Sequence, residues 1–323
     1  MIKILPQNKF LLTILLVCFL TQLYAQKTQK FYDYKMQECD RQSARFLSIV
    51  AKVDSGYCKK IYYVRERKLQ MLGYFKDSLL QIKNGKFHYY HSNGFPKTFG
   101  RYVNGKKEGL WYGFHDNRIM SDSTVYEHDN QIGGSLSWYP NGQLSDSVYT
   151  NEDGSGTCIS WFDNGTLSSK GQYSEGHKQH GLWKYYHQNG KISAEEIYFE
   201  SYLTDKKYYD ENGMQLTGAL NNDRIAMFPG GDKGWRKYID NHIFFPPDYK
   251  IINGDAVTIV VSFTVNEQGI VENVFTSTGF DLNFDQIAID AINKSPRWLP
   301  AIEHNRKVKC IFNQIVNFHQ IDW

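Results

Sequence analysis

Gly181-Leu182-Trp183-Lys184-Tyr185-Tyr186-His187-Gln188-Asn189-Gly190 is the stretch that decides the fold of this 323-residue chain. It opens on a glycine, carries an aromatic residue three positions before an asparagine, and closes on an Asn-Gly pair. Asn-Gly is a strong hairpin signal, because both residues tolerate the positive φ angles of a tight turn. The stretch therefore predicts a strand from Gly181 to Tyr186 that enters a β-hairpin.

The same pattern recurs on both sides of this stretch at steps of 23 to 25 residues. Asn117-Arg118 fills the one gap among the Asn-Gly turns, which are Asn93-Gly94, Asn141-Gly142, Asn164-Gly165, Asn189-Gly190 and Asn212-Gly213. The aromatic residues three positions before each asparagine are Tyr90, Phe114, Trp138, Trp161, Tyr186 and Tyr209. A glycine precedes five of the six asparagines by eight positions, and a tyrosine follows the first five by eight or nine. This agreement predicts six hairpins over residues 85–217.

Stacked hairpins can bury aromatic surface that a single hairpin leaves exposed. One hairpin cannot bury its aromatic face, whereas neighbouring units can cover one another. We therefore expect one elongated sheet with a continuous aromatic stripe. The pattern resembles variant MORN repeats of the form G-x-W-x-x-Y-x-x-N-G, with a degraded copy around Tyr62 to Phe75. The resemblance implies a scaffold for protein interactions, and some relatives are antitoxin components of toxin–antitoxin pairs.

Composition supports a mainly β globular protein. Hydrophobic residues make up 41% of the chain and charged residues 22%, which is enough apolar material for a core. The 23 tyrosines and 26 glycines favour short strands and turns over helices. A formal net charge of +3 argues against a nucleic-acid partner, because phosphate binding requires a concentrated basic face.

The first 25 residues read as a secretory signal peptide. Lys3 and Lys9 precede an apolar run from Phe10 to Leu23, and a small residue, Ala25, stands at the expected cleavage point. The run is shorter than the roughly 20 residues that span a bilayer. We expect export to the periplasm or cell envelope. An uncleaved anchor is the alternative, and it would be the only membrane contact apart from partners.

Residues 26–84 are expected to form an N-terminal cap that includes the degraded repeat. Phe46, Ile49, Val50 and Val53 have helical spacing, so a short helix is predicted there. Export permits disulfides, and Cys39 and Cys58 are close enough in sequence to pair. Cys158 and Cys310 lie in strand-like patterns and are expected to be buried thiols.

The repeat fades after Leu216, and residues 218–227 read as a linker to a different domain at 228–323. A helix is predicted at Trp235–His242 and a second one around Phe284, with Asp281 or Asn283 as its cap. Strands are predicted at 257–265, 270–277 and 307–318 from their alternating apolar residues. The expected fold is an α+β domain in which two helices pack on a three-stranded antiparallel sheet.

This domain resembles the C-terminal domain of the TonB family. The residues that carry the resemblance are Phe228-Pro229-Gly230-Gly231, the Phe263-x-Val265-x-x-x-Gly269 run and Trp298-Leu299-Pro300-Ala301. It implies that the last strand lies at the sheet edge beside a central first strand and binds an extended peptide of an outer-membrane transporter. The implied edge runs from Arg306 to Phe318. Its expected contact residues are Arg306, Lys307, Val308, Lys309, Cys310, Ile311, Phe312, Asn313, Gln314 and Ile315.

No catalytic or cofactor motif stands out. The sequence has no GxSxG, HExxH or Walker pattern, so we expect neither enzymatic activity nor a cofactor. His91, His115 and His187 share one register and could form a metal-binding ladder, although a solvated face is the simpler interpretation. The aromatic residues could stack on sugars, but packing explains them first. We expect no metal.

Function is therefore predicted to be protein binding in the cell envelope. The partners would be TonB-dependent outer-membrane transporters or another envelope complex, with a link to transmembrane transport. With only 8 prolines and no proline-rich linker, we do not expect this chain alone to couple transport to the proton-motive force. The alternative is an antitoxin-like or immunity-like protein whose repeat surface neutralises a toxin.

Overall fold

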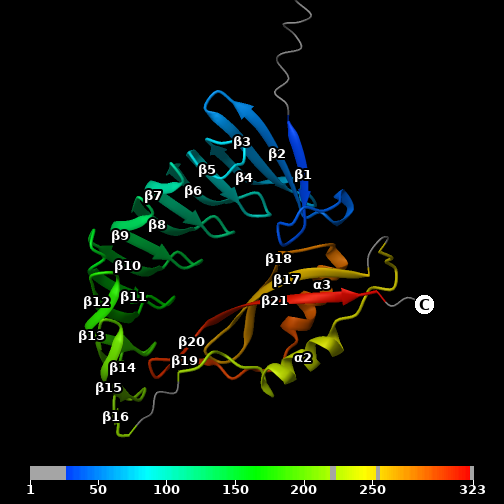
Figure 1. Cartoon of the computed structure of the whole chain (residues 1–323). Coiled ribbons are helices and arrows are strands. Elements are labelled where there is room, and N and C mark those ends of the chain that lie inside the picture. Colours follow the sequence, from blue (N-terminus) through cyan, green and yellow to red (C-terminus); the bar gives the residue numbers. More distant parts are fainter. Residues whose placement is uncertain (1–26, 219–222, 252–254, 321–323) are drawn as a thin grey trace, which may run out of the picture. The chain divides into compact units, whose positions relative to one another are not determined.

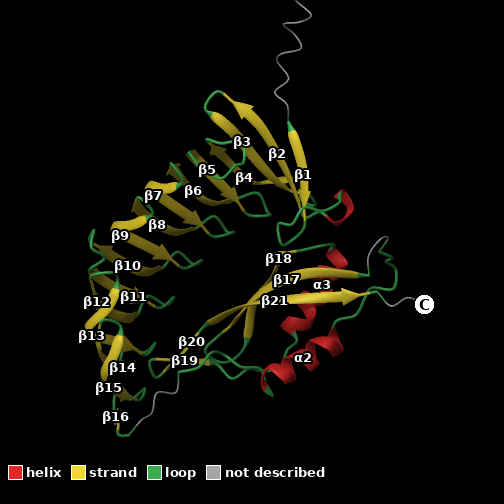
Figure 2. Ribbon diagram, viewed as in Figure 1, coloured by secondary structure: helices red, strands yellow, loops and turns green. Residues whose placement is uncertain are grey.

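The computed structural model describes residues 27–218, 223–251 and 255–320. The predicted signal peptide and the alternative anchor lie outside these residues. Within the described ranges, no helix is both long and apolar enough to cross a membrane. The chain is mainly β, with sixteen strands in one sheet and a smaller α+β region after them (Figures 1 and 2). It divides into two compact units, residues 1–109 and 110–323.

The first unit is built from antiparallel hairpins. Its elements are β1 (Thr28–Tyr32), the 3-10 helix η1 (Arg41–Ser43), β2 (Phe46–Val53), β3 (Gly56–Tyr63), β4 (Lys68–Phe75), β5 (Gly85–Tyr90) and β6 (Pro96–Val103). A buried aromatic cluster forms on one face, where the Phe87 ring lies 5.4 Å from Phe75 and 4.9 Å from Tyr102. The degraded repeat around Tyr62 to Phe75 is thus a hairpin as well.

The helix predicted at residues 46–53 is wrong, because this segment is strand β2. It pairs with β3 from Phe46↔Tyr63 to Val53↔Gly56, across a two-residue turn at Asp54-Ser55. Four apolar residues at helical spacing also fit a strand that is partly covered on both faces, and its β-branched residues favour that strand.

The sequence left open whether Cys39 and Cys58 form a disulfide, and in the structure both residues are free thiols. The Cys39 amide bonds to the Phe31 carbonyl of β1, whereas Cys58 lies in β3, and β2 separates those two strands. Two strand spacings amount to about 10 Å, which exceeds the Cα separation that a disulfide can bridge.

The second unit continues the hairpins. Its strands are β7 (Lys106–Phe114, which contains the division between the units), β8 (Met120–Glu127), β9 (Asn130–Trp138), β10 (Leu144–Thr150), β11 (Gly156–Trp161), β12 (Leu167–Ser174), β13 (Lys178–Tyr186), β14 (Ile192–Phe199), β15 (Tyr202–Tyr209) and β16 (Gln215–Leu216). All sixteen strands of the sheet are neighbours in chain order. The strands end at the predicted aromatic residues, so the predicted hairpin positions are confirmed.

The turns at the asparagines differ from the predicted two-residue type. At Asn141 the connection spans Tyr139 to Gln143, and only Gly142 has a positive φ, of 85°. The Asn141 side-chain oxygen instead accepts a hydrogen bond from the Gln143 amide at 3.0 Å. Asparagine is therefore suited to this position by its side chain, which replaces a backbone acceptor.

Tight turns with two positive φ angles occur at the other end of the hairpins. His128-Asp129 has φ angles of 53° and 74°, and Glu200-Ser201 has 50° and 68°. Each joins two strands directly, as expected for the mirror-image turns that match strand twist. The strongest hairpin signal in the sequence thus marks the looser of the two turn types.

The buried stripe is not continuous, which corrects the sequence expectation. The position six residues before the turn asparagine holds Trp111 and Trp183, each 3% exposed, but Ser135 and Cys158 occupy it in the two repeats between them. The aromatic residues three before the asparagine are only half-buried. The Trp183 ring lies over Gly171 of the neighbouring strand, where a Cβ atom would come within 2.1 Å of the ring.

The C-terminal region has the predicted α+β fold. Its elements are α2 (Gly231–His242), β17 (Ala256–Val265), β18 (Val271–Thr278), α3 (Leu282–Asn293), β19 (Ala301–Glu303), β20 (Arg306–Val308) and β21 (Cys310–His319). The three-stranded sheet has the order β18-β17-β21, which confirms a central first strand and a last strand at the edge. The single strand predicted at 307–318 is divided at Lys309, because β20 pairs with β19 instead.

One closed apolar core holds this region together. Ile259, Phe263 and Phe284 are at most 1% exposed, and α2 packs against the core through Trp235. The Asp281 carboxylate caps α3 by accepting from the Asn283 amide, as predicted. The motif residue Gly269 is required because the Trp298 carbonyl lies 2.0 Å from where its Cβ would stand. The Trp298 amide in turn donates to the Gly269 carbonyl at 2.8 Å.

Candidate peptide-binding edge

Strand β21 lies at an edge of the three-stranded sheet. It pairs with β17 along its whole length, from Val265↔Cys310 to Ala256↔His319, and the described sheet gives it one neighbouring strand. An edge strand of this kind presents a row of N–H and C=O groups that a further strand can pair with. Ten residues at about 3.3 Å each offer a ladder roughly 33 Å long.

The side chains of β21 alternate between two faces. Phe312, Val316 and Phe318 point into the core, and the Phe312 ring lies 5.4 Å from that of Phe263. Ile311 is 73% exposed and Ile315 is 52% exposed on the opposite face. An added strand would therefore lie beside two exposed apolar side chains, Ile311 and Ile315, which are four positions apart.

Polar side chains hold β21 in place against its neighbours. The Trp235 indole N–H donates to the Gln314 side-chain oxygen at 2.7 Å, which ties β21 to α2. The Asn313 side-chain oxygen accepts from the Ser262 hydroxyl, and the Asn317 side-chain oxygen accepts from the Thr258 hydroxyl at 2.8 Å. These bonds fix the side chains of β21 against α2 and β17. The Gln314 side-chain amide also donates to the Ile315 carbonyl at 2.6 Å, so a strand that pairs there must displace this bond.

The first four residues of the predicted edge lie elsewhere. Arg306, Lys307 and Val308 form β20, which pairs with β19 from Glu303↔Arg306 to Ala301↔Val308. The Lys309 ammonium makes ion pairs with Asp163 of the repeat sheet at 2.6 Å and with Glu272 of β18 at 3.5 Å. The open part of the candidate edge is therefore Cys310 to Ile315, with its continuation to His319.

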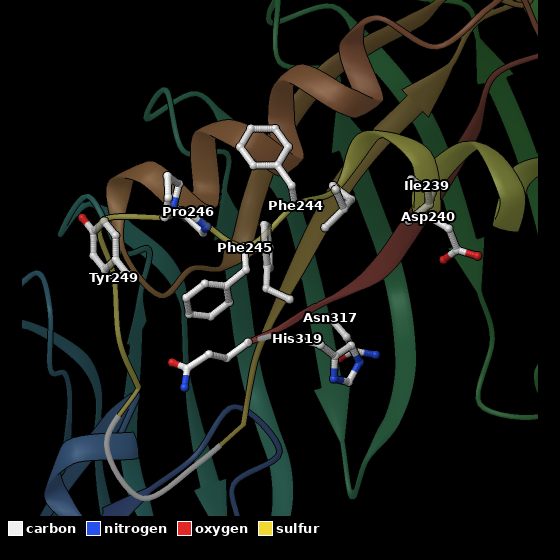
Figure 3. Close-up of a pocket in the computed structure, with 12 residues that line it drawn as sticks. Ile239, Asp240, Phe244, Phe245, Pro246, Tyr249, Asn317 and His319 are labelled. Atoms are coloured by element: carbon white, nitrogen blue, oxygen red, sulfur yellow. The ribbon is translucent and has the colours of Figure 1, made fainter. Parts of the chain in front are cut away.

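A hollow of about 570 Å³ lies beside the C-terminal end of β21. Figure 3 shows Phe244, Phe245 and Tyr249 on one side of it and His319 on the other. Phe244 is 61% exposed. The Tyr249 hydroxyl donates to the Asp281 carboxylate at 2.8 Å, which raises the pKa of Tyr249. The sequence gives no local sign of this hollow, because Pro246-Pro247 by itself indicates only that the preceding helix has ended.

Two of the three histidines that could form a metal-binding ladder, His115 and His187, bond to backbone carbonyls instead. The His115 ring lies 2.7 Å from the Trp138 carbonyl oxygen, and the His187 ring lies 3.0 Å from that of Tyr209. His187 is only 8% exposed, so the solvated-face interpretation is wrong for it. Among the residues that the structure describes, no group of three or more His, Cys, Asp or Glu side chains is placed to hold a metal ion.

Comparison with known families agrees with this geometry. Residues 247–319 match the family model described as Gram-negative bacterial TonB protein C-terminal. The match spans β17 to β21 and begins after the Phe228–Gly231 motif and α2. No curated protein matches the chain. The chain thus carries a TonB C-terminal domain, which indicates an envelope-associated protein that interacts with other proteins.

Proposed function

We propose that this chain is a non-enzymatic cell-envelope protein that captures an extended peptide by β-strand addition to β21. The observation that carries the proposal is the open edge itself. β21 has one neighbouring strand in the described sheet, lies within the family match, and alternates core residues with exposed Ile311 and Ile315. Backbone pairing would supply affinity, and the side chains beside the edge would supply specificity.

The partner class follows from the family and from the chemistry of the edge. TonB-type systems pair this edge with a segment of an outer-membrane transporter, and we infer the same class of partner here. An apolar side chain at alternate positions of the segment would pack beside Ile311 and Ile315. The hairpin repeats act as a MORN-like scaffold that presents the domain.

The proposal is tested by peptide binding to the full exported chain. Fluorescence anisotropy would measure the affinity for N-terminal peptides of outer-membrane transporters from the same organism. Ile311→Pro removes a backbone N–H and stiffens the strand, and we expect at least tenfold weaker binding. Ile311→Val keeps the backbone and is the matched control. Circular dichroism confirms folding of both variants, and a folded Ile311→Pro protein with unchanged affinity contradicts strand addition.

A second candidate function rests on an exposed apolar patch of the repeat sheet. Phe199 is 61% exposed and pairs with Tyr202, which is 76% exposed, while Leu182 pairs with Ile197 at 47% and 43% exposure. Such a patch suits an antitoxin-like surface that covers a toxin. Co-expression with a toxin encoded by a neighbouring gene tests this idea. Relief of toxicity that is lost in Phe199→Ser supports it, and absence of any relief rejects it.

A further inference from the structure

A ladder of side-chain hydrogen bonds joins neighbouring repeats of the described sheet. In these bonds the donor is the side chain two positions before a turn asparagine. The acceptor is a backbone carbonyl of the next repeat, that of the aromatic residue three positions before its turn asparagine. Tyr139 bonds in this way to the Trp161 carbonyl at 2.9 Å, and His187 to that of Tyr209 at 3.0 Å. The sheet register shifts beside Trp161, and it shifts again beside Tyr186, which holds the equivalent position in the next repeat. A side-chain donor therefore compensates for the irregular pairing.

The ladder is broken at one repeat. Phe162 occupies the position that holds Tyr139 and His187 in its neighbours, and its ring has no donor for the Tyr186 carbonyl. Arg306 of the C-terminal domain supplies the missing hydrogen bond at 2.8 Å. The same guanidinium nitrogen also donates to the Ser168 carbonyl. A residue 120 positions away in the sequence thus completes a ladder that the repeat leaves open.

The side chains around Arg306 form a site that fits a guanidinium group. Its guanidinium carbon lies 5.2 Å from the ring centroid of Phe162 and 5.5 Å from that of Tyr185, so two aromatic faces flank the cation. Arginine suits such a site better than lysine, because its flat, weakly hydrated guanidinium stacks on rings and donates several bonds in a fixed plane. Burial lowers the pKa of Arg306.

The residues before Arg306 fit the same surface. The His304 ring stacks on Tyr185 with centroids 3.5 Å apart, and its Nδ1 lies 2.9 Å from the carboxylate of Glu196, a residue only 1% exposed. The Asn305 side-chain amide donates to the Tyr209 carbonyl at 3.0 Å, beside the bond from His187. Three consecutive side chains of the β19–β20 hairpin, those of His304, Asn305 and Arg306, therefore bond to neighbouring repeats.

We propose that the repeat sheet carries a guanidinium-binding site at Phe162 and Tyr185, and that its occupant is Arg306 of the same chain. This site anchors the C-terminal domain to one chosen repeat of the array. Phe162 cannot donate to the Tyr186 carbonyl, whereas Tyr139 and His187 supply the equivalent hydrogen bond in the neighbouring repeats. Arg306 therefore binds at the repeat that contains Phe162. The proposal does not depend on strand addition at β21, which lies on a separate edge.

The test uses the full chain with a protease site in place of residues 219–222, cut after folding. Association of the two fragments is then measured by dilution and size-exclusion chromatography. We expect wild-type fragments to stay together and Arg306→Lys, which keeps the charge but loses the planar fork, to weaken association at least tenfold. Lys307→Ala is the matched control, since Lys307 is the exposed next residue of β20, and it should behave as wild type.

A second variant on the sheet side keeps the test decisive if Arg306 variants fold poorly. Phe162→Tyr restores the donor that Tyr139 provides one repeat earlier, so it should compete for the Tyr186 carbonyl and weaken fragment association without lowering the urea midpoint of the sheet. Methylguanidinium should speed dissociation of wild-type fragments more than equimolar methylammonium. Unchanged association in both Arg306→Lys and Phe162→Tyr, or equal effects of the two cations, overturns the proposal.

Discussion

The repeat sheet and the C-terminal domain are both built on antiparallel strands, but they are stabilised differently. In the C-terminal domain, Phe263 and Phe284 are almost completely buried in one closed core. In the repeats, bonds such as Tyr139 to Trp161 and Asn141 to Asp163 recur between residues 22 positions apart. A closed core derives its stability from buried area, whereas an open sheet depends on register-specific bonds between neighbouring repeats.

The difference also separates their roles in binding. The closed core lets the C-terminal domain keep β21 rigid while one of its edges stays open. The repeats bury a smaller cluster, in which Cys158 packs with Trp183 and Tyr185, and their regularly placed carbonyls also accept hydrogen bonds from side chains. One region is thus suited to pairing with a backbone, and the other to receiving individual side chains.

The largest expected effect tests the closed core. Phe284→Ala deletes a ring that contacts Phe245, Tyr249, Phe280 and Phe318, with centroids 5.1 to 5.3 Å apart. We expect a loss of about 3–5 kcal/mol in the free energy of unfolding of this domain. Urea unfolding followed by hydrogen exchange would locate the loss. A matching loss of protection in the repeat sheet would show that the two regions do not differ as described.

A medium effect tests the close packing in the open sheet. Gly171→Ala would place a Cβ atom against the buried Trp183 ring, and we expect a cost of about 1–3 kcal/mol from overpacking. Gly134→Ala is the control, because no atom lies within 4 Å of the added Cβ and the residue does not have a positive φ. Equal thermal midpoints for the two variants would contradict the account of this contact.

The buried acid Glu196 should make the docking of the β19–β20 turn sensitive to acid. Burial acts to raise the pKa of Glu196, but hydrogen bonds from His304 and Tyr198 outweigh it, and the pKa is lowered. A lowered pKa means that the unfolded chain takes up this proton first, so the contribution of Glu196 is complete above the ordinary carboxyl pKa of about 4.3 and declines as the pH falls below it. Glu196→Gln should flatten the dependence of the urea midpoint between about pH 5 and 3. An unaltered slope would exclude Glu196 as its source.

The smallest expected effect tests the turn ladder. Asn141 accepts from Gln143 within its turn and donates to the Asp163 carbonyl in the next one. Asn141→Asp keeps the acceptor and removes the donor, so we expect a loss of about 0.5–1.5 kcal/mol. Asn164→Asp is the comparison, since there Thr166 bonds to the next turn instead. A larger loss at Asn164 than at Asn141, measured by urea unfolding, would refute this role.

Sequence alone predicted the hairpins and the order of the C-terminal elements, because both follow from local periodicity. It failed at Phe46 to Val53, where helical spacing and a partly covered strand give the same pattern. It also assigned the wrong cause to the asparagines, whose side chains rather than φ angles shape the turns. The docking of Arg306 joins residues 120 and 138 positions apart, which no local pattern encodes. The one available signal was Phe162 at a position where neighbouring repeats carry histidine or tyrosine.

Amide hydrogen exchange of the full chain with and without a bound transporter peptide tests strand addition most directly. A strand added to β21 pairs only with the outward-facing amides, so protection should rise at every second residue between Cys310 and His319. The amides that already face β17 should change little. Protection that rises uniformly along β21, or only on the repeat sheet, would contradict strand addition as the binding mode.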